Sequence, residues 1–242
     1  MIEVQGLEKS FDSRLVVKRL SFQAPDGAIT GLLGANNAGK TTTLRMICGV
    51  LKPDSGTLLI DEVALDSLGR QRRLGALLDH IGVYSRLTVR ENLTYFGRLR
   101  GMLPTVLEKR VNEAISILGL QSIADRRTFG FSQGERMKTA LGRAILHSPQ
   151  HLLLDEPTNG LDIPTVRSLR ELLRRLRDAG TCIVFSSHVL EEVRALCDSV
   201  VIISNGRLIA QGSQTEICSE TNTDSMEEAF VKLTSSQESS IC

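Results

Sequence analysis

Residues Gly34 to Thr41 carry the clearest chemical pattern in the chain. They read Gly-Ala-Asn-Asn-Ala-Gly-Lys-Thr and fit G-x-x-x-x-G-K-[ST], the phosphate-binding P-loop. Successive backbone N–H groups of such a loop point inward and form a site for an anion. We expect Lys40 to reach the β- and γ-phosphates of a nucleotide, and the Thr41 hydroxyl to ligate Mg²⁺. The candidate nucleotide-binding residues here are Gly34, Ala35, Asn36, Asn37, Ala38, Gly39, Lys40, Thr41 and Thr42.

A Gly-rich turn can match this pattern by accident, so the flanking segments decide. The apolar run 29–33 predicts a buried strand before the loop, and residues 42–51 predict a helix after it. That strand–loop–helix order is the context the motif requires. The helix also adds free N–H groups and the positive end of its dipole. Nucleotide binding is therefore the favoured interpretation.

A pair of acids, Asp155 and Glu156, directly follows the apolar run 152–154. Two carboxylates at the rim of a buried strand repel each other and must be hydrated or bind a cation. Beside a P-loop the natural cation is Mg²⁺, which Asp155 would hold. Glu156 is then placed to polarise a water molecule.

Two further polar residues follow predicted strands. Asp79 comes after the run 74–78, at the kind of strand end where ligands collect in open α/β sheets, although it can also be an ordinary loop carboxylate. His188 follows the strand predicted at 182–185 and precedes a helix at 189–197. A lone histidine is more often structural, but this position favours a functional role. For Phe11, position alone favours an ordinary core aromatic.

Residues 88–146 are predicted to be mostly helical. Thr88 with Glu91, and Ser132 with Glu135, fit the capping-box pattern of a helix start. The second of these starts could bind an anion, but spacing alone favours a capped helix and nothing more. Near the C-terminus, residues 213–225 are polar, 226–233 predict a short helix, and 235–242 predict disorder.

The composition limits the classes of protein to which this chain can belong. The chain has 242 residues, 41% of them hydrophobic, and a net charge of +1, which indicates no nucleic-acid partner. No apolar run approaches the roughly 18 residues that a membrane span needs, and the N-terminus lacks a signal-peptide pattern. We therefore expect a soluble, cytoplasmic protein. The five cysteines lack C-x-x-C spacing and predict neither a disulfide framework nor a zinc site.

Taken together, these motifs resemble those of ABC transporter ATP-binding subunits over about residues 1–212. The resemblance rests on "GANNAGKTT" (Walker A), "FSQGERMKTALGRAILHSP" (signature motif and its helix), "HLLLDEPTNGLD" (Walker B and D-loop) and "FSSHVLEEV" (switch histidine). The segments "RLTVRENLTYFGRLRGM" and "NGRLIAQG" are similar to the exporter-type, NatA-like sodium- and drug-efflux ATPases.

The resemblance implies an α/β fold: a P-loop NTPase core with a mixed or parallel sheet, an N-terminal antiparallel β subdomain and a helical insert. It implies an ABC ATPase domain at 1–225, with the β subdomain and core at about 1–79 and 147–212 and the helical subdomain at about 80–146. Residues 226–242 would form a short helix and a polar tail.

The resemblance also implies a mechanism, in which two subunits sandwich two Mg²⁺-ATP molecules head to tail. The signature residues Ser132, Gln133, Gly134 and Glu135 would meet the nucleotide held by the other subunit. Glu156 would be the general base, Asp155 a Mg²⁺ ligand through water, and His188 a γ-phosphate contact. Asp162 would bridge the dimer, and Phe11 would stack on adenine. The partner would be a second copy or a related ATPase subunit. A membrane permease would dock near residues 80–100 and hold the chain at the inner face of the cell membrane.

Three residues depart from the family pattern. Asn37 and Gln133 stand where glycine is usual, and Asp79 stands at the usual glutamine position. Asn tolerates positive φ, so we expect the loop to survive. Gln133 could crowd the phosphate or add a hydrogen-bond donor, and Asp79 could still ligate Mg²⁺. The alternatives are a degenerate ATP-binding half of a heterodimer and, ranked last, a soluble ABC ATPase of translation or DNA repair.

Overall fold

The computed structural model describes residues 1–78 and 82–238. Its strands are β1 Ile2–Phe11, β2 Arg14–Ala24, β3 Ile29–Leu33, β4 Ser55–Ile60, β5 Val63–Ala64, β6 Leu74–Leu77, β7 His151–Asp155, β8 Cys182–Ser187, β9 Ser199–Ser204 and β10 Arg207–Gly212. Its helices are α1 Lys40–Ile47, α2 Ser67–Arg73, α3 Val89–Leu99, α4 Pro104–Ile117, the 3-10 helix η1 Gln121–Ile123, α5 Gln133–Ile145, α6 Ile163–Asp178, α7 Leu190–Leu196, α8 Gln214–Thr221 and α9 Met226–Glu238.

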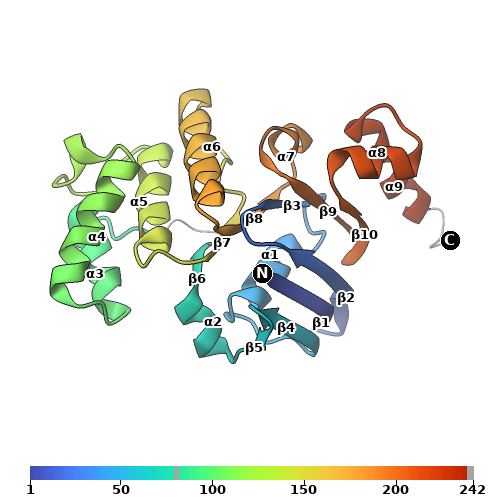
Figure 1. Cartoon of the computed structure of the whole chain (residues 1–242), viewed down its shortest axis with the longest axis horizontal. Coiled ribbons are helices and arrows are strands. Elements are labelled where there is room, and N and C mark those ends of the chain that lie inside the picture. Colours follow the sequence, from blue (N-terminus) through green and yellow to red (C-terminus); the bar gives the residue numbers. More distant parts are fainter. Residues whose placement is uncertain (79–81, 239–242) are drawn as a thin grey trace.

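Two sheets organise these elements (Figure 1). An antiparallel sheet has the strand order β2-β1-β4-β5, and a six-stranded sheet has the order β10-β9-β3-β8-β7-β6. The six-stranded sheet is parallel except for β10, which pairs antiparallel with β9. The predicted mixed α/β core with an N-terminal antiparallel sheet is confirmed. In this order β3, β8 and β7 are neighbours, so their carboxyl ends meet at one edge.

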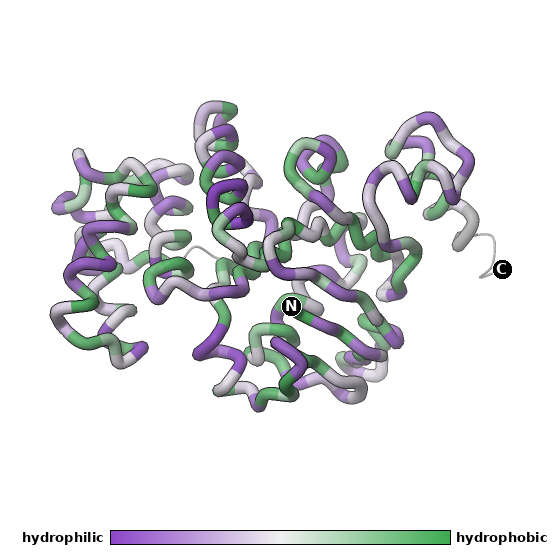
Figure 2. Tube along the Cα trace, viewed as in Figure 1, coloured by the Kyte–Doolittle hydropathy of each residue, from purple (hydrophilic) through white to green (hydrophobic). Residues whose placement is uncertain are grey.

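The central strands β3, β7 and β8 of the six-stranded sheet are buried on both faces, and the apolar residues in Figure 2 follow them. Successive residues of β7 point to opposite faces. Leu152 and Leu154 belong to the core beneath α6 and α7, whereas Leu153 belongs to the core shared with α1 and the antiparallel sheet. All three are at most 1% exposed. Full burial on both faces is typical of parallel strands and holds their ends rigidly.

The helical part consists of α3, α4 and α5, which stand to one side of the sheet (Figure 1). Both predicted capping boxes are present, at Thr88 with Glu91 and at Ser132 with Glu135. Helices α3 and α4 approach closely at Gly97, where an added Cβ would lie 2.1 Å from Leu107 Cδ1. The helix starts therefore lie where the sequence predicts them.

Several predictions of local structure were wrong. Helix α1 ends at Ile47 and not at residue 51, because Gly49 adopts a φ of 78° just beyond it. For the polar segment 213–225 no element was predicted, and it contains helix α8, whose start is a capping box of Ser213 and Glu216. Helix α9 continues to Glu238, into the segment expected to be disordered, and its Ala229 is fully buried.

Candidate nucleotide site

The loop between β3 and α1 has the backbone of a phosphate-binding nest. Gly39 has a φ of 104° and Asn37 a φ of 66°. Asn37 thus supplies the left-handed conformation expected of it. A Cβ on Gly34 would lie 2.3 Å from the carbonyl oxygen of Ile203, so only glycine fits there. Both motif glycines are therefore required by geometry.

Lys40 lies over this loop and is 5% exposed. Its Nζ donates hydrogen bonds to the carbonyl oxygens of Gly34, at 2.8 Å, and Ala35, at 3.1 Å. The same Nζ lies 3.4 Å from Glu156 Oε1. The ammonium is thus held between the P-loop and the acid that follows β7.

Asp155 is bound from both sides by hydroxyl groups. Thr41 Oγ1 donates to Asp155 Oδ2 at 2.7 Å, and Ser186 Oγ donates to Asp155 Oδ1 at 2.5 Å. The parallel register of β7 and β8 pairs Asp155 with Ser186 and so sets this contact. Ser186 was not among the residues predicted from sequence. Knowledge that β7 and β8 are neighbours would have identified it.

Glu156 and His188 form the second polar pair at this edge. His188 Nδ1 lies 2.7 Å from Glu156 Oε2, and both side chains are partly exposed. Glu156 has a φ of 45°, and its backbone N–H donates to Ser186 Oγ at 3.0 Å. A non-glycine residue in this region stores strain, which is typical of functional sites. The predicted residues Lys40, Thr41, Asp155, Glu156 and His188 therefore converge.

Of these residues, Lys40, Thr41 and Glu156 border a cavity of about 660 Å³. It is lined by Arg14, Leu15, Val16, Lys18, Asn36, Asn37, Gly39, Lys40, Thr41, Thr42, Glu156 and Asn205. The contribution of β2 and of Asn205 was missed from the sequence. The tip of the β9–β10 hairpin is fixed beside the loop, since Gly206 N donates to Ala38 O and Lys18 N donates to Gly206 O.

Comparisons with known proteins identify the class of site. The family described as "ABC transporter" matches residues 17–159. The chain is 40% identical to the ABC transporter ATP-binding protein NatA of Bacillus subtilis over 220 residues, covering 88% of this chain and 89% of that protein. The chain belongs to the ABC transporter family. It is an ATP-binding subunit of the family's ATPase class.

Further relatives and solved structures agree with this family. The linearmycin resistance ATP-binding protein LnrL of Bacillus subtilis is 32% identical, with 93% of this chain and 73% of that protein covered. The Nod factor export ATP-binding protein I of a Rhizobium species is 37% identical, covering 90% and 73%. A solved ATP-binding subunit of an ABC transporter superposes with a TM-score of 0.87 at 28% identity, covering 96% of this chain and 99% of that one.

The ABC signature residues lie away from this cavity. Ser132, Gln133, Gly134 and Glu135 form the start of α5, and none of them is among the residues that line the cavity. Ser132 accepts a hydrogen bond from Glu135 N at 3.2 Å. Asp162 caps α6 by accepting from Thr165 N at 2.8 Å, and this hydrogen bonding lowers the pKa of Asp162. Within one chain, the P-loop and the signature residues are therefore separate.

Two predicted site residues remain, Phe11 and Asp79. Phe11 ends β1 and is 45% exposed, so the expectation of a core aromatic was wrong. It is absent from the cavity lining, although Arg14, its cross-strand neighbour, is present. Asp79 lies outside the described residues. No helix in the described part of this ABC chain is long and apolar enough to cross a membrane.

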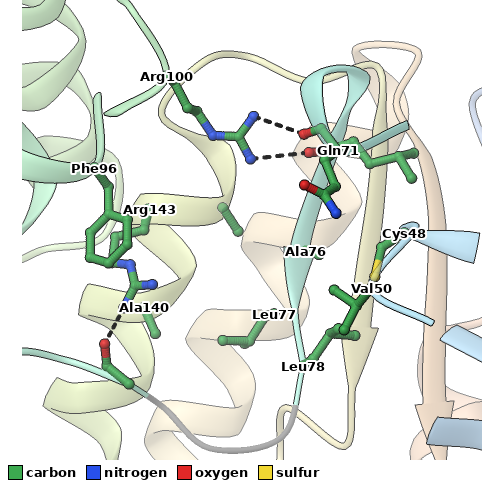
Figure 3. Close-up of a pocket in the computed structure, with 13 residues that line it drawn as sticks. Cys48, Val50, Gln71, Ala76, Leu77, Leu78, Phe96, Arg100, Ala140 and Arg143 are labelled. Atoms are coloured by element: carbon green, nitrogen blue, oxygen red, sulfur yellow. Dashed lines mark hydrogen bonds between the residues drawn. The ribbon is translucent and has the colours of Figure 1, made fainter. Parts of the chain in front are cut away.

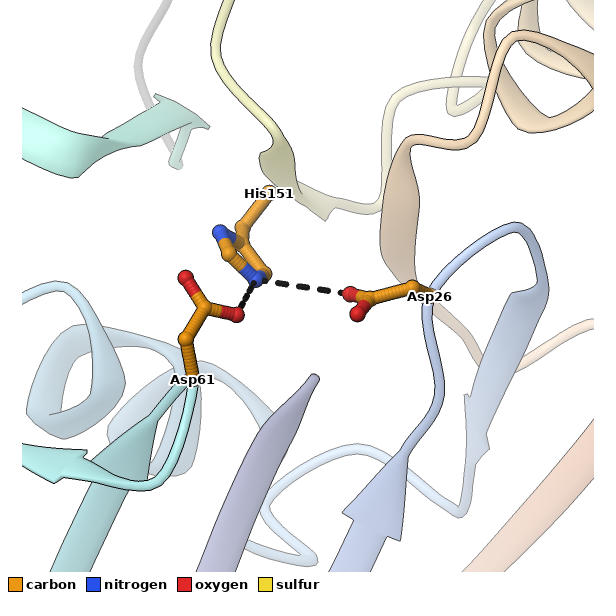
Figure 4. A group of neighbouring side chains, drawn as sticks. All are labelled: Asp26, Asp61 and His151. Carbon is orange, nitrogen blue, oxygen red and sulfur yellow. Dashed lines mark ion pairs between the residues drawn. The ribbon is translucent and has the colours of Figure 1, made fainter.

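A separate cluster of Asp26, Asp61 and His151 lies at the start of β7, of which His151 is the first residue (Figure 4). His151 Nε2 is 3.0 Å from Asp61 Oδ1 and 3.5 Å from Asp26 Oδ1. The Met1 ammonium contacts both carboxylates, at 2.5 and 2.8 Å. Burial lowers the pKa of His151 despite the nearby Asp61. Because the ammonium already supplies the positive charge, these residues form an ion-pair cluster that joins β1 to β7.

Proposed function

We propose that this chain hydrolyses Mg²⁺-ATP at the interface of a head-to-tail dimer and thereby powers a membrane exporter. The observation that carries the proposal is the position of Glu156, whose carboxylate lies between Lys40 Nζ and His188 Nδ1. A carboxylate beside a phosphate-binding lysine can polarise the attacking water, and the lysine and histidine can stabilise charge on the γ-phosphate. Lys40, Glu156 and His188 are accordingly the catalytic residues.

Mg²⁺ fits the oxygen donors of this edge. Thr41 Oγ1 and Asp155 Oδ2 converge to 2.7 Å, and Mg²⁺ prefers such hard oxygen ligands together with water and phosphate. When bound, the cation would neutralise charge on the β- and γ-phosphates. Asp79 is proposed as a third oxygen donor. The hydroxyl groups of Thr41 and Ser186 orient Asp155, because each donates a hydrogen bond to one of its two carboxylate oxygens.

A dimer explains the second anion-ready helix start. The exposed N-terminus of α5 carries the signature residues but does not reach the cavity of its own chain. Free N–H groups and the helix dipole would favour a phosphate presented by another subunit. Asp162 would lie in the same interface. The partner is a second copy or a related ATPase subunit, and the export direction is supported by relatives named for Nod factor export and linearmycin resistance.

A permease is proposed to dock beside α3, at the inner face of the membrane. A cavity of about 370 Å³ lies there, between β6 and the helical subdomain of about residues 80–146 (Figure 3). Its wall combines the apolar side chains of Val50 and Leu77 with the guanidinium groups of Arg100 and Arg143. Val50, Leu99 and Leu103 are each at least 65% exposed at or near it. Exposed apolar residues around a hollow are typical of protein interaction sites.

The proposal is tested by the Mg²⁺-ATPase rate as a function of protein concentration. We expect a rate that rises faster than linearly for the wild type. Glu156→Gln should keep ATP binding and lose at least about 100-fold in rate. Glu171→Gln, on the exposed face of α6, is the matched control and should leave the rate unchanged. A rate near zero in the wild type, with ATP still bound, would instead favour the degenerate half-site or dependence on the permease.

A further inference from the structure

Gln133, the first residue of α5, makes a contact that its position in the signature motif does not predict. Its Nε2 donates a hydrogen bond to the backbone carbonyl of Asn159 at 2.7 Å. The two residues are 26 positions apart and belong to different parts of the fold. The amide is therefore directed toward the loop after β7, within its own chain.

The loop that receives this contact is shaped to fit the amide. A Cβ on Gly160 would lie 2.6 Å from Gln133 Nε2 and 2.8 Å from Gln133 Oε1. Gly160 also has a φ of 70°, a conformation that favours glycine. The side chain of Gln133 thus rests directly against the backbone of this loop.

The same loop carries Glu156. Asn159 N donates to Glu156 O at 3.2 Å, and Leu161 N donates to Thr158 O at 3.1 Å. The backbone of Asn159 is therefore fixed relative to that of Glu156 by one tight turn. The start of α5 also approaches the start of α6 closely, since a Cβ added at Gly134 would lie 3.2 Å from Thr165.

We propose that Gln133 is a positioning residue: its amide ties the start of the signature helix to the turn that carries Glu156, in place of contacting nucleotide. The inference rests on the proposed function, in which α5 of one subunit meets the nucleotide of the other. When that nucleotide contacts Ser132 and Gly134, the effect passes through Gln133 to the position of Glu156 in the same chain. A nucleotide in one site of the dimer thereby influences the water-polarising residue in the other.

The test compares Gln133→Ala and Gln133→Glu with the wild type. Glutamate keeps the size but presents an acceptor to the Asn159 carbonyl, so it removes the donor specifically. We expect both variants to lower kcat by about tenfold, with KM for ATP within about twofold. Gln121→Ala is the matched control, because Gln121 is exposed and its amide also donates to a backbone carbonyl, that of Ser116 at 3.4 Å. It should change neither constant.

Amide hydrogen exchange of residues 158–161, followed by mass spectrometry, measures the effect of the Gln133 contact on this loop without requiring ATP hydrolysis. Both Gln133 variants should exchange faster than wild type in this loop, with the P-loop unchanged. A raised KM at constant kcat would assign Gln133 to nucleotide binding, and unchanged exchange in the loop would show that no tie exists; either result overturns the inference. A wild type without ATPase activity would refute the proposed function alone, because the exchange measurement still decides the role of Gln133.

Discussion

Replacement of Ser186 by alanine should weaken the proposed Mg²⁺ site, although Ser186 is not itself a proposed Mg²⁺ ligand. Ser186 is fully buried, and its hydroxyl does two things at once. It donates to Asp155 Oδ1 at 2.5 Å and accepts from Glu156 N at 3.0 Å. The substitution therefore affects both acids at the end of β7.

The magnitude follows from these two contacts. A hydrogen bond to a charged group contributes about 1.5–3 kcal/mol, and a donor left unsatisfied costs about 1–3 kcal/mol. The two effects share one hydroxyl and are not additive, so we expect the free energy of unfolding to fall by about 2–3 kcal/mol. The strained Glu156 backbone, with φ at 45°, also loses the acceptor that holds it. We therefore expect kcat to fall by at least about tenfold.

Urea unfolding and titration calorimetry measure the two effects separately. ATP binding in EDTA should be unchanged, because the P-loop is intact, whereas the Mg²⁺ concentration needed for half-maximal activity should rise. Thr30→Val is the matched control. Thr30 is fully buried on the neighbouring strand β3, and its hydroxyl has no hydrogen-bond partner among the described residues. If Ser186→Ala behaves like this control in stability and in Mg²⁺ dependence, the reasoning is refuted.

Three further predictions concern other contacts. Gly206→Ala would put a Cβ 2.1 Å from Val16 O at a φ of 80°, and should lower stability by about 2–4 kcal/mol in urea; Gly101→Ala, at a φ of 74° with no atom within 4 Å, should cost only about 1 kcal/mol. Burial, with the charge of Arg100, lowers the pKa of His147 to about 4. The histidine of the unfolded chain takes up its proton near pH 6.5, so the free energy of unfolding should fall by about 1–2 kcal/mol as the pH drops from about 6.5 to about 4. Urea midpoints measured over this pH range should show the loss in the wild type and not in His147→Gln. Phe11→Ala should weaken ATP binding by about five- to tenfold if Phe11 stacks on adenine, and leave tripolyphosphate binding unchanged in the same calorimetric assay; equal weakening of both ligands would contradict adenine stacking.

The sequence was most informative about the candidate site residues that directly follow a strand. The strands before the P-loop, before the acids after β7 and before the histidine after β8 were predicted correctly, because each is a short apolar run of the length typical of a fully buried strand. Parallel strands end at one edge, so their convergence could also be anticipated. Ser186 could not be found in this way, because its contact with Asp155 depends on the order of strands in the sheet.

The part of the cavity wall that β2 and the β9–β10 hairpin contribute could not be predicted from the sequence, for a different reason. Val16 and Gly206 are distant in the chain, and no periodic pattern links them. Their approach depends on the absence of a side chain at Gly206, whose Cα lies close to the carbonyl oxygen of Val16. A glycine at a hairpin turn is expected for its conformation alone. The pattern therefore gives no sign that this glycine also holds the hairpin against β2 and the P-loop, beside the cavity.

The site residues are held in two distinct ways. Asn37, Gly39 and Glu156 adopt positive φ values at the edge of a sheet whose central strands are buried on both faces. Strained backbone persists only where its surroundings over-determine it, and a close-packed core provides that rigidity. In the turn at residues 156–161, Thr158 is buried and Leu161 packs against the core. Asn159 and Gly160 are exposed at its tip, where Gln133 Nε2 donates a hydrogen bond to the Asn159 carbonyl. Rigid strand ends thus fix where the phosphates and the proposed Mg²⁺ would bind, and we infer that the exposed tip of the turn is the part of the site through which the signature helix influences hydrolysis.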